Sequence, residues 1–259
     1  MTDRWHGASY ERLSDPQFRW GARVLDRLEL GGAETVLDAG CGTGRLTALL
    51  LERLPRGRVI AVDRSESMLD TARAKLEPRF GSRLELVRAD LQTFVAPRPV
   101  DVVFSTATFH WILDHDLLFR NLFASLAPGG RLEAQCGGGP NLLCFHARAA
   151  QLMGSERYAR HFAGWREPWQ FADPAVTADR LRAAGFEEVA TGVEEQPTSF
   201  ADAATFRGFI ERIVLHAHLA PLPVALREPF LDALVAQSAR DRPPYTLDYW
   251  RLNLRGRRS

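Results

Sequence analysis

The sequence has few cysteines and no long apolar run, and each absence excludes a class of protein. Its three cysteines, Cys41, Cys136 and Cys144, form no CxxC pair, so neither a disulfide framework nor a cysteine-based zinc cage is expected. No stretch approaches the ~18 consecutive apolar residues that a membrane-spanning helix requires. The first residues lack the apolar region of a secretory signal. We therefore expect a cytoplasmic protein in a reducing compartment.

An excess of charge of one sign is also missing. The 259 residues include 33 basic and 32 acidic side chains, for a formal net charge of +1. Lys75 is the sole lysine, so almost all of the positive charge is arginine. This balance argues against charge-driven binding to nucleic acid or to a membrane, and the expected partner is a small molecule. A solvated tail is expected for the terminal arginines, Arg251, Arg255, Arg257 and Arg258.

What the sequence does contain, between residues 35 and 136, is an alternation of short apolar runs with helical patterns. The apolar runs are of strand length and bounded by turn residues, and Ser65 is placed to cap one of the helices. Strand–helix alternation predicts an α/β fold, with a doubly wound and mostly parallel sheet. The strands are expected at 35–39, 59–62, 84–87, 100–104 and 131–136, and the helices at 45–54, 66–76 and 116–126.

Outside this core the pattern changes. Residues 1–30 have one apolar helical face and predict an N-terminal helical segment. The later elements are expected to be helices at 141–163, 174–184, 202–219 and 223–239 and strands at 186–195 and 245–254. A nucleotide-binding layer needs roughly 150–200 residues, which leaves a surplus. We interpret 1–259 as a single domain, in which 137–170 and 200–243 are helical insertions that cover the substrate pocket.

The most informative segment follows the first predicted strand. Asp38 stands two residues before a glycine-rich turn, Gly40-Cys41-Gly42-Thr43-Gly44, that opens the next helix. Glycine lets the backbone approach a ligand closely, and ligands of such sheets bind at the carboxyl ends of the strands. Two further acids, Asp63 and Asp90, follow the second and third strands. Asp38 suits a cationic amino group, Asp63 suits two ribose hydroxyls, and Asp90 suits an adenine amine.

These residues resemble the motifs of the class I S-adenosylmethionine-dependent methyltransferases. The GxGxG spacing differs from the GxGxxG of the NAD-binding fingerprint. The resemblance covers 35–136, and the matching segments are Asp38–Gly44, Val62–Leu69, Ala89–Leu91, Ser105–Trp111 and Leu126–Gly130. The flanks more weakly resemble the trans-aconitate methyltransferase-like branch, through Tyr10–Arg19, Phe109–Trp111 and the late helical insertions.

The resemblance implies a Rossmann-like methyltransferase fold of seven strands, the last of them antiparallel, and S-adenosyl-L-methionine as the cofactor. It implies cofactor contacts from Asp38, Gly40, Cys41, Gly42, Gly44, Asp63, Arg64, Met68, Asp90, Leu91 and Thr106. Where the branch carries an arginine that can hold the methionine carboxylate, this sequence has Gln17, which joins the cofactor-binding set. We take that departure as an argument against trans-aconitate itself as the acceptor.

Candidates for the acceptor site follow the fourth strand or lie in the insertions. His110 is a candidate general base, with a structural histidine as the alternative. No metal site is expected, because His216 and His218 are two residues apart and do not share a helix face. The other pocket candidates are Tyr10, Trp111, Trp165, Trp169 and His216. The candidates for a clamp on a substrate carboxylate are Arg148, Arg160, Arg166 and Arg212.

Together these features predict a methyltransferase that acts on a small molecule. O-methylation of a carboxylic acid is the leading reaction, because a carboxylate is nucleophilic at neutral pH without a base. The alternatives are N-, C- or phenolic O-methylation of a small metabolite, an NAD-linked oxidoreductase, and a non-catalytic cofactor-binding module. Methylation of tRNA or protein is disfavoured, because Ser105–Thr108 replaces the N/D-P-P-aromatic motif of many nitrogen methyltransferases. A monomer or a homodimer is expected.

Overall fold

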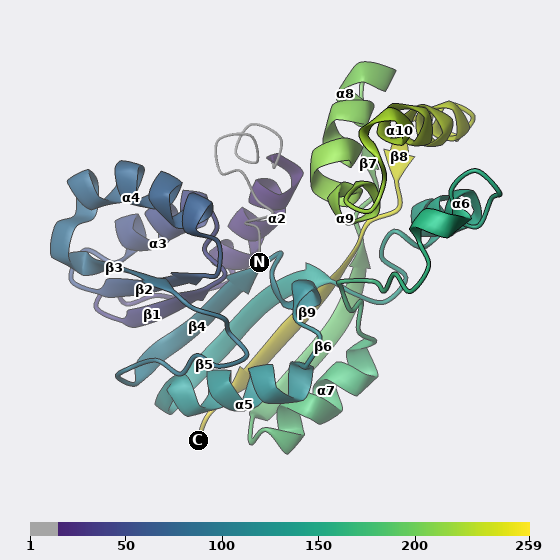
Figure 1. Cartoon of the computed structure of the whole chain (residues 1–259). Coiled ribbons are helices and arrows are strands. Elements are labelled where there is room, and N and C mark those ends of the chain that lie inside the picture. Colours follow the sequence, from purple (N-terminus) through teal and green to yellow (C-terminus); the bar gives the residue numbers. More distant parts are fainter. Residues whose placement is uncertain (1–14) are drawn as a thin grey trace. The chain divides into compact units, whose positions relative to one another are not determined.

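The computed structural model describes residues 15–259, and its central feature is a seven-stranded sheet (Figure 1). The strands are β1 (Thr35–Ala39), β2 (Arg58–Asp63), β3 (Leu84–Arg88), β4 (Val100–Thr106), β5 (Leu126–Gly137), β6 (Glu187–Glu195) and β9 (Trp250–Arg257). Their order is β3-β2-β1-β4-β5-β9-β6. The pairs among β1 to β5 are parallel, whereas β9 runs antiparallel to β5. The predicted fold class is therefore confirmed, and the strand order reverses between β1 and β4, where such sheets bind ligands.

Helices pack on both faces of this sheet because its strands are apolar on both sides. On β1, Val36 faces a core shared with the helices α2 (Asp15–Asp26) and α3 (Arg45–Arg53). The next residue, Leu37, faces a second core shared with α5 (His115–Ser125) and α7 (Pro174–Ala183). The helix after β2, α4 (Glu66–Phe80), begins where predicted, since the Ser65 hydroxyl accepts the Met68 N–H at 3.3 Å.

The prediction of a solvated tail is wrong for Arg251 and Arg258, whereas the side chains of Arg255 and Arg257 are exposed. Arg251 belongs to β9 and is only 3% exposed. The backbone of Arg258 pairs with Gly129 and Gly130, and its guanidinium donates to the carbonyls of Phe123 and Leu126. β5 starts at Leu126 and not at residue 131, because Leu126 pairs with Val100 of β4 and the backbone of Arg258 pairs with Gly129 and Gly130.

The described chain falls into two compact units. One contains the residues up to Gly139 together with Trp169–Glu194 and Arg251–Ser259. The other consists of Pro140–Pro168 and Glu195–Trp250, in the part of the chain where the two insertions are expected. The second unit contains α6 (Leu143–Met153), α8 (Ala203–Phe209), α9 (His216–Leu219), α10 (Val224–Ser238) and the short strands β7 (Thr198–Ser199) and β8 (Thr246–Leu247).

Two long helices predicted in this second unit are interrupted. The helix expected over 141–163 ends at Met153, where Gly154 caps it, and only a short 3-10 turn, Ala159–His161, follows. The helix expected over 202–219 is divided by a π-helical turn at Ile210–Val214. The hydrophobic spacing is continuous through the π-helical turn, so periodicity alone does not reveal that break, whereas Gly154 and Ser155 mark the first one. None of the helices that the structure describes is long and apolar enough to cross a membrane.

Candidate active site

The glycine turn after β1 is held in place by its neighbours on both sides. The backbone N–H groups of Gly40 and Cys41 both donate to the Val62 carbonyl, at 2.8 and 3.0 Å. Gly40 has a φ of +90°, and a Cβ at this position would lie 2.1 Å from the Thr108 hydroxyl oxygen. Only glycine fits here, because any side chain would clash with Thr108 in a backbone conformation that L-residues avoid.

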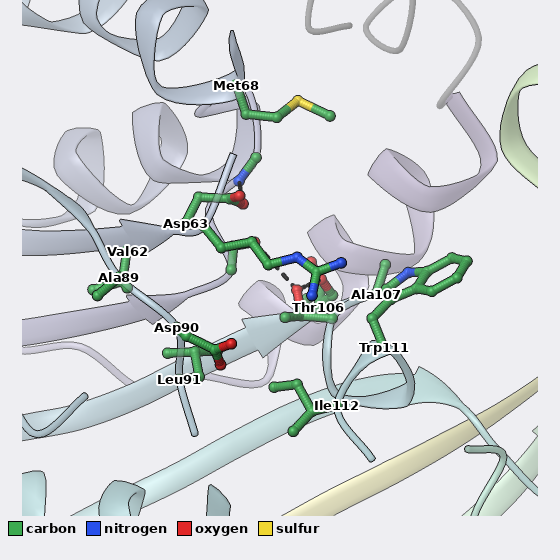
Figure 2. A pocket seen from close by; sticks show the side chains of 14 residues that line it. Val62, Asp63, Met68, Ala89, Asp90, Leu91, Thr106, Ala107, Trp111 and Ile112 are labelled. Carbon is green, nitrogen blue, oxygen red and sulfur yellow. Dashed lines mark hydrogen bonds between the residues drawn. The ribbon is translucent and has the colours of Figure 1, made fainter. Parts of the chain in front are cut away.

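A cavity of about 750 Å³, including its open mouth, lies at the carboxyl ends of β1, β2, β3 and β4. Figure 2 shows the carboxylates of Asp63 and Asp90 in this cavity, with apolar side chains around them. Its lining residues are Gly40, Gly42, Val62, Asp63, Arg64, Met68, Ala89, Asp90, Leu91, Thr106, Ala107, Thr108, Trp111 and Ile112.

The two carboxylates in this cavity are oriented by backbone N–H groups. The Asp63 oxygens accept one bond each, from Gly42 N–H and from Ser65 N–H, both at 2.9 Å. These two bonds hold the Asp63 carboxylate in the wall of the cavity. One oxygen of Asp90 accepts the Gln92 N–H at 2.9 Å. These bonds fix both acids where they can accept from the polar edge of a ligand.

A second, smaller cavity shares Gly40, Gly42, Thr106 and Ala107 with the first. It has a volume of about 470 Å³ with its mouth. Its other lining residues are Gln17, Phe18, Asp38, Cys41, Thr43, Arg45 and Leu46. Because the glycine turn contributes to both walls, the two cavities can accommodate two ends of one elongated ligand.

Asp38 is an acidic residue in the wall of the smaller cavity, and its carboxylate favours a positively charged group there. The residue is only 2% exposed, and the Thr47 hydroxyl donates to its carboxylate at 2.6 Å. Burial raises the pKa of this carboxyl group to about 7, with a further contribution from the negative charge of Asp63. A cation in the cavity would offset the cost of the buried charge. Burial also raises the pKa of the Cys41 thiol, so this cysteine is a packing residue rather than a nucleophile.

The residues present fit S-adenosyl-L-methionine. The larger cavity offers apolar surfaces and two acids for a base and a ribose diol, and the smaller one offers Asp38 for an ammonium group. An added Cβ at Gly42 would meet nothing within 4 Å, so the backbone there is open. Among residues 15–259, the buried Gln17 Oε1 atom has no hydrogen-bond partner. Such an orphaned atom is expected where a ligand completes the site.

Comparison with known proteins agrees with this fit. Residues 36–130 match a family model described as a methyltransferase domain. The trans-aconitate 2-methyltransferase of Methylobacterium radiotolerans is 33% identical over 253 residues, which cover 93% of this chain and 91% of the relative. The chain belongs to the trans-aconitate methyltransferase family. A relative of the same name from Paracidovorax citrulli is 32% identical over 88% of this chain and 86% of its own.

Members of this family are S-adenosylmethionine-dependent enzymes, and the family's fold recurs in more distant structures. A Haemonchus contortus phosphoethanolamine N-methyltransferase, solved with phosphomonomethylethanolamine and S-adenosylhomocysteine, superimposes with a TM-score of 0.64. It is 18% identical, and the match covers 100% of this chain and 58% of that one. At this identity the likeness shows the fold alone. Membership of the family, and not this likeness, shows that the chain is a methyltransferase that uses S-adenosylmethionine.

The cavities contain nearly all of the predicted cofactor residues. Gly44 is the exception, since it lines neither cavity, and an added Cβ there would lie 2.5 Å from the Leu76 side chain. Its role is to let α3 and α4 pack closely. Sequence reasoning missed the lining residues Phe18, Thr43, Arg45, Leu46, Val62, Ala89, Ala107, Thr108 and Ile112. Arg45 directly follows the glycine turn, so its position alone could have suggested it.

Gln17 lines the smaller cavity beside Asp38. The departure from the branch at this position therefore concerns cofactor binding. It gives no information about the acceptor, so Gln17 does not disfavour trans-aconitate as the substrate.

His110 is only 8% exposed and lines neither cavity, although the next residue in the sequence, Trp111, lines the larger one. Its Nδ1 atom accepts the Gly137 N–H at 3.2 Å, which places the proton of a neutral ring on Nε2. Burial, followed by the positive charge of Arg251, holds the pKa of His110 well below its usual value. The ring is therefore neutral, and it is a weak base.

The aromatic candidates divide between the two units. In the first unit, Trp111 and Trp169 pack edge to face with ring centroids 6.1 Å apart. In the second, Trp165 donates from its indole N–H to the Ala217 carbonyl at 3.3 Å, and His216 begins α9. Tyr10 lies outside the described residues.

The clamp candidates all belong to the second unit. Arg148 donates two hydrogen bonds to the carboxylate of Asp241, at 2.8 and 2.6 Å. Asp241 thus accepts from both of the Nη groups that a substrate carboxylate would need, so Arg148 is a structural residue. Arg160 donates to His161 at 3.2 Å.

Proposed function

We propose that this enzyme transfers the methyl group of S-adenosylmethionine to a carboxylate oxygen of a small organic acid. The relatives named trans-aconitate 2-methyltransferase support this substrate class, since aconitate is a carboxylic acid. The near-neutral charge of the chain supports a small-molecule acceptor over a nucleic acid. A monomer or homodimer remains our expectation, as does the cover role of the insertions at 137–170 and 200–243.

The state of His110 is the structural observation that carries the choice of acceptor. A phenol or an ammonium acceptor must lose a proton before or during transfer, and this requires a competent base. The His110 ring is neutral, with Nδ1 already accepting a backbone N–H. A carboxylate needs no base, because it is ionised and nucleophilic at neutral pH. We therefore assign His110 the role of a donor through Nε2–H that orients an acceptor oxygen, in place of the general base.

The task of the protein is alignment and exclusion of water. When bound, S-adenosylmethionine supplies an electrophilic methyl group on a positively charged sulfur. Asp63 and Asp90 would hold the nucleoside, Asp38 would hold the ammonium group, and the apolar walls at Trp111 and Ile112 would keep water away. The carboxylate oxygen then forms a bond to the methyl carbon as the carbon–sulfur bond breaks, so charge is neutralised and no proton moves.

The test is a methyl-transfer assay with a panel of acceptors, monitored by S-adenosylhomocysteine formation. The panel contains trans-aconitate, other di- and tricarboxylates, monocarboxylates, phenols and amines. We expect turnover with at least one carboxylate and little with phenols or amines. Turnover confined to phenols or amines would contradict the proposed acceptor class. His110→Gln retains a donor and is expected to retain more activity than His110→Ala.

A further inference from the structure

A third cavity, the distal groove, opens on the sheet of the first unit and is lined by residues 27–29, 131–133, 188 and 255–257. Its volume is about 880 Å³ with its mouth, and its walls come mainly from β5 and β9. Among the described residues, no residue that lines it also lines either cofactor cavity. Arg131 precedes the end of β5 at Gly137 by six residues, so the groove lies roughly 20 Å along the strand from the edge where the cofactor cavities lie.

Two arginines stand opposite each other in the wall of the distal groove. Leu132 packs into the core on one face of the sheet, so its neighbours Arg131 and Glu133 point to the other face. In the antiparallel register of β5 and β9, Glu133 is paired with Arg255, a combination of opposite charges. Arg131 is paired with Arg257 in the same register, so two positive charges lie opposite each other, an arrangement that destabilises a sheet. An anion between these two arginines would remove that cost.

The glutamates of the distal groove do not neutralise this pair of arginines. Glu133 is only 8% exposed, and its carboxylate is shared by Arg27 at 3.0 Å and Arg255 at 3.6 Å. The carboxylate of Glu188 lies 3.7 Å from the Arg257 guanidinium. Both of these side chains are more than half exposed, and such an open ion pair is weak.

Arg131 has no carboxylate of its own. Its guanidinium donates to the backbone carbonyl of Glu29, a neutral group, and no carboxylate among residues 15–259 forms an ion pair with it. Burial raises the pKa of Glu133, and the charge of Arg131 opposes this shift less than the two arginines in contact with that carboxylate do. With four arginines and three glutamates in its wall, the distal groove has an excess of positive charge.

We propose that the distal groove binds a small polyanion, with one oxyanion group between Arg131 and Arg257 and a second within reach of Arg255. The planar guanidinium fork suits the oxygens of carboxylate and phosphoryl groups alike. Arg255 is diagonal to Arg131 across the two strands, a separation that long side chains bridge. A small ligand is favoured over a nucleic acid, because three glutamates in the wall repel a continuous phosphate backbone.

Calorimetric titration of the full chain with two probes tests this site. Pyrophosphate represents phosphoryl ligands and citrate represents polycarboxylates, so the two titrations identify the source of the negative charges. We expect at least one probe to bind saturably at one site per chain, and Arg131→Met and Arg257→Met each to weaken this binding about 10-fold or more. Citrate can also enter an acceptor site, so only the binding that these two variants weaken is assigned to the distal groove.

Arg98→Met is the matched control, because it removes the same charge from the same unit. Arg98 pairs with Glu85 at 2.7 Å and lines none of the three cavities described here. Its substitution should leave binding of both probes unchanged. Binding of S-adenosylhomocysteine should match that of the wild type in all three variants, which verifies that they fold and separates the distal groove from methyl transfer.

Four results would overturn the proposal. Wild-type protein that binds neither probe has no such site, and equal affinities in the wild type and the two groove variants would place the bound anion elsewhere. An equal loss of affinity in Arg98→Met would show a general effect of net charge. A single-stranded oligonucleotide that displaces the bound probe would show a nucleic-acid surface in place of a site for a small ligand.

Discussion

Binding of the cofactor should depend on pH through Asp38. The carboxyl group of this residue is buried beside Thr47, and its pKa is raised to about 7 in the absence of a ligand. The ammonium group of the ligand interacts favourably with the ionised carboxylate, so binding lowers the pKa and releases a proton. Affinity is therefore complete above pH 7 and falls as the pH drops through the raised pKa.

The size of the effect follows from the ionised fraction of Asp38. With a pKa of about 7, roughly nine-tenths of the carboxyl groups are ionised at pH 8 and roughly one-tenth at pH 6. If only the ionised form binds, the apparent Kd for S-adenosylhomocysteine rises about 10-fold between pH 8 and pH 6. At pH 7 about half a proton is released for each ligand bound.

Calorimetry in buffers of different ionisation enthalpy measures both quantities at once, the Kd and the number of protons released. Asp38→Asn is the control, since the amide keeps an acceptor for the Thr47 hydroxyl and cannot titrate. The variant should bind weakly at pH 8, and its Kd should be nearly the same at pH 6. A wild-type Kd that is flat from pH 8 to pH 6, with no proton release at pH 7, would refute the assignment of Asp38 to the ammonium group.

Two further predictions concern stability and the nucleoside site. The pKa of Asp38 in the folded state is about 7, above its ordinary value of 3.8. The protonated carboxyl group therefore contributes fully to the stability of the fold below pH 3.8, and this contribution is lost as the pH rises through about 7. Asp38→Asn should therefore raise the Tm of the ligand-free protein at pH 8 by at least about 2 °C, with a smaller difference near pH 4. An equal or lower Tm at pH 8 would contradict the inference that the buried, ionised carboxylate destabilises the fold. Asp63→Ala should weaken S-adenosylhomocysteine binding about 10-fold or more, because it removes the ribose contact and the bonds to Gly42 and Ser65. Asp70→Ala, on the exposed face of α4, is its control, and equal affinities for the two variants in calorimetry would remove Asp63 from the site.

The cofactor site was predictable because its residues lie in short sequence motifs at the ends of strands. Asp38, Asp63 and Asp90 lie at or just beyond the carboxyl ends of three strands whose apolar runs are unambiguous. Parallel pairing brings these ends to one edge of the sheet. The cap at Ser65 is likewise a local signal. Such features need no knowledge of distant contacts.

Features that depend on distant partners were not predictable. Arg251 and Arg258 were predicted to belong to a charged tail. Instead, Arg251 pairs with β5 as part of β9, and the guanidinium of Arg258 donates to the carbonyls of Phe123 and Leu126. Arg148 was a clamp candidate, and Asp241, 93 residues further along the chain, holds it. Arg45 escaped notice because only the fold places it beside Gln17, which comes from another helix.

Transfer of a methyl group from S-adenosylmethionine to a carboxylate oxygen is the step on which the proposed function depends. The most direct measurement supplies the cofactor with an isotopically labelled methyl group and follows the label by mass spectrometry in the product of the preferred acceptor. We predict a product one methyl group heavier than the acid, from which mild alkali releases the label as methanol, as an ester requires. A labelled product that resists alkali, as an ether, an amine or a carbon–methyl bond does, would contradict the account.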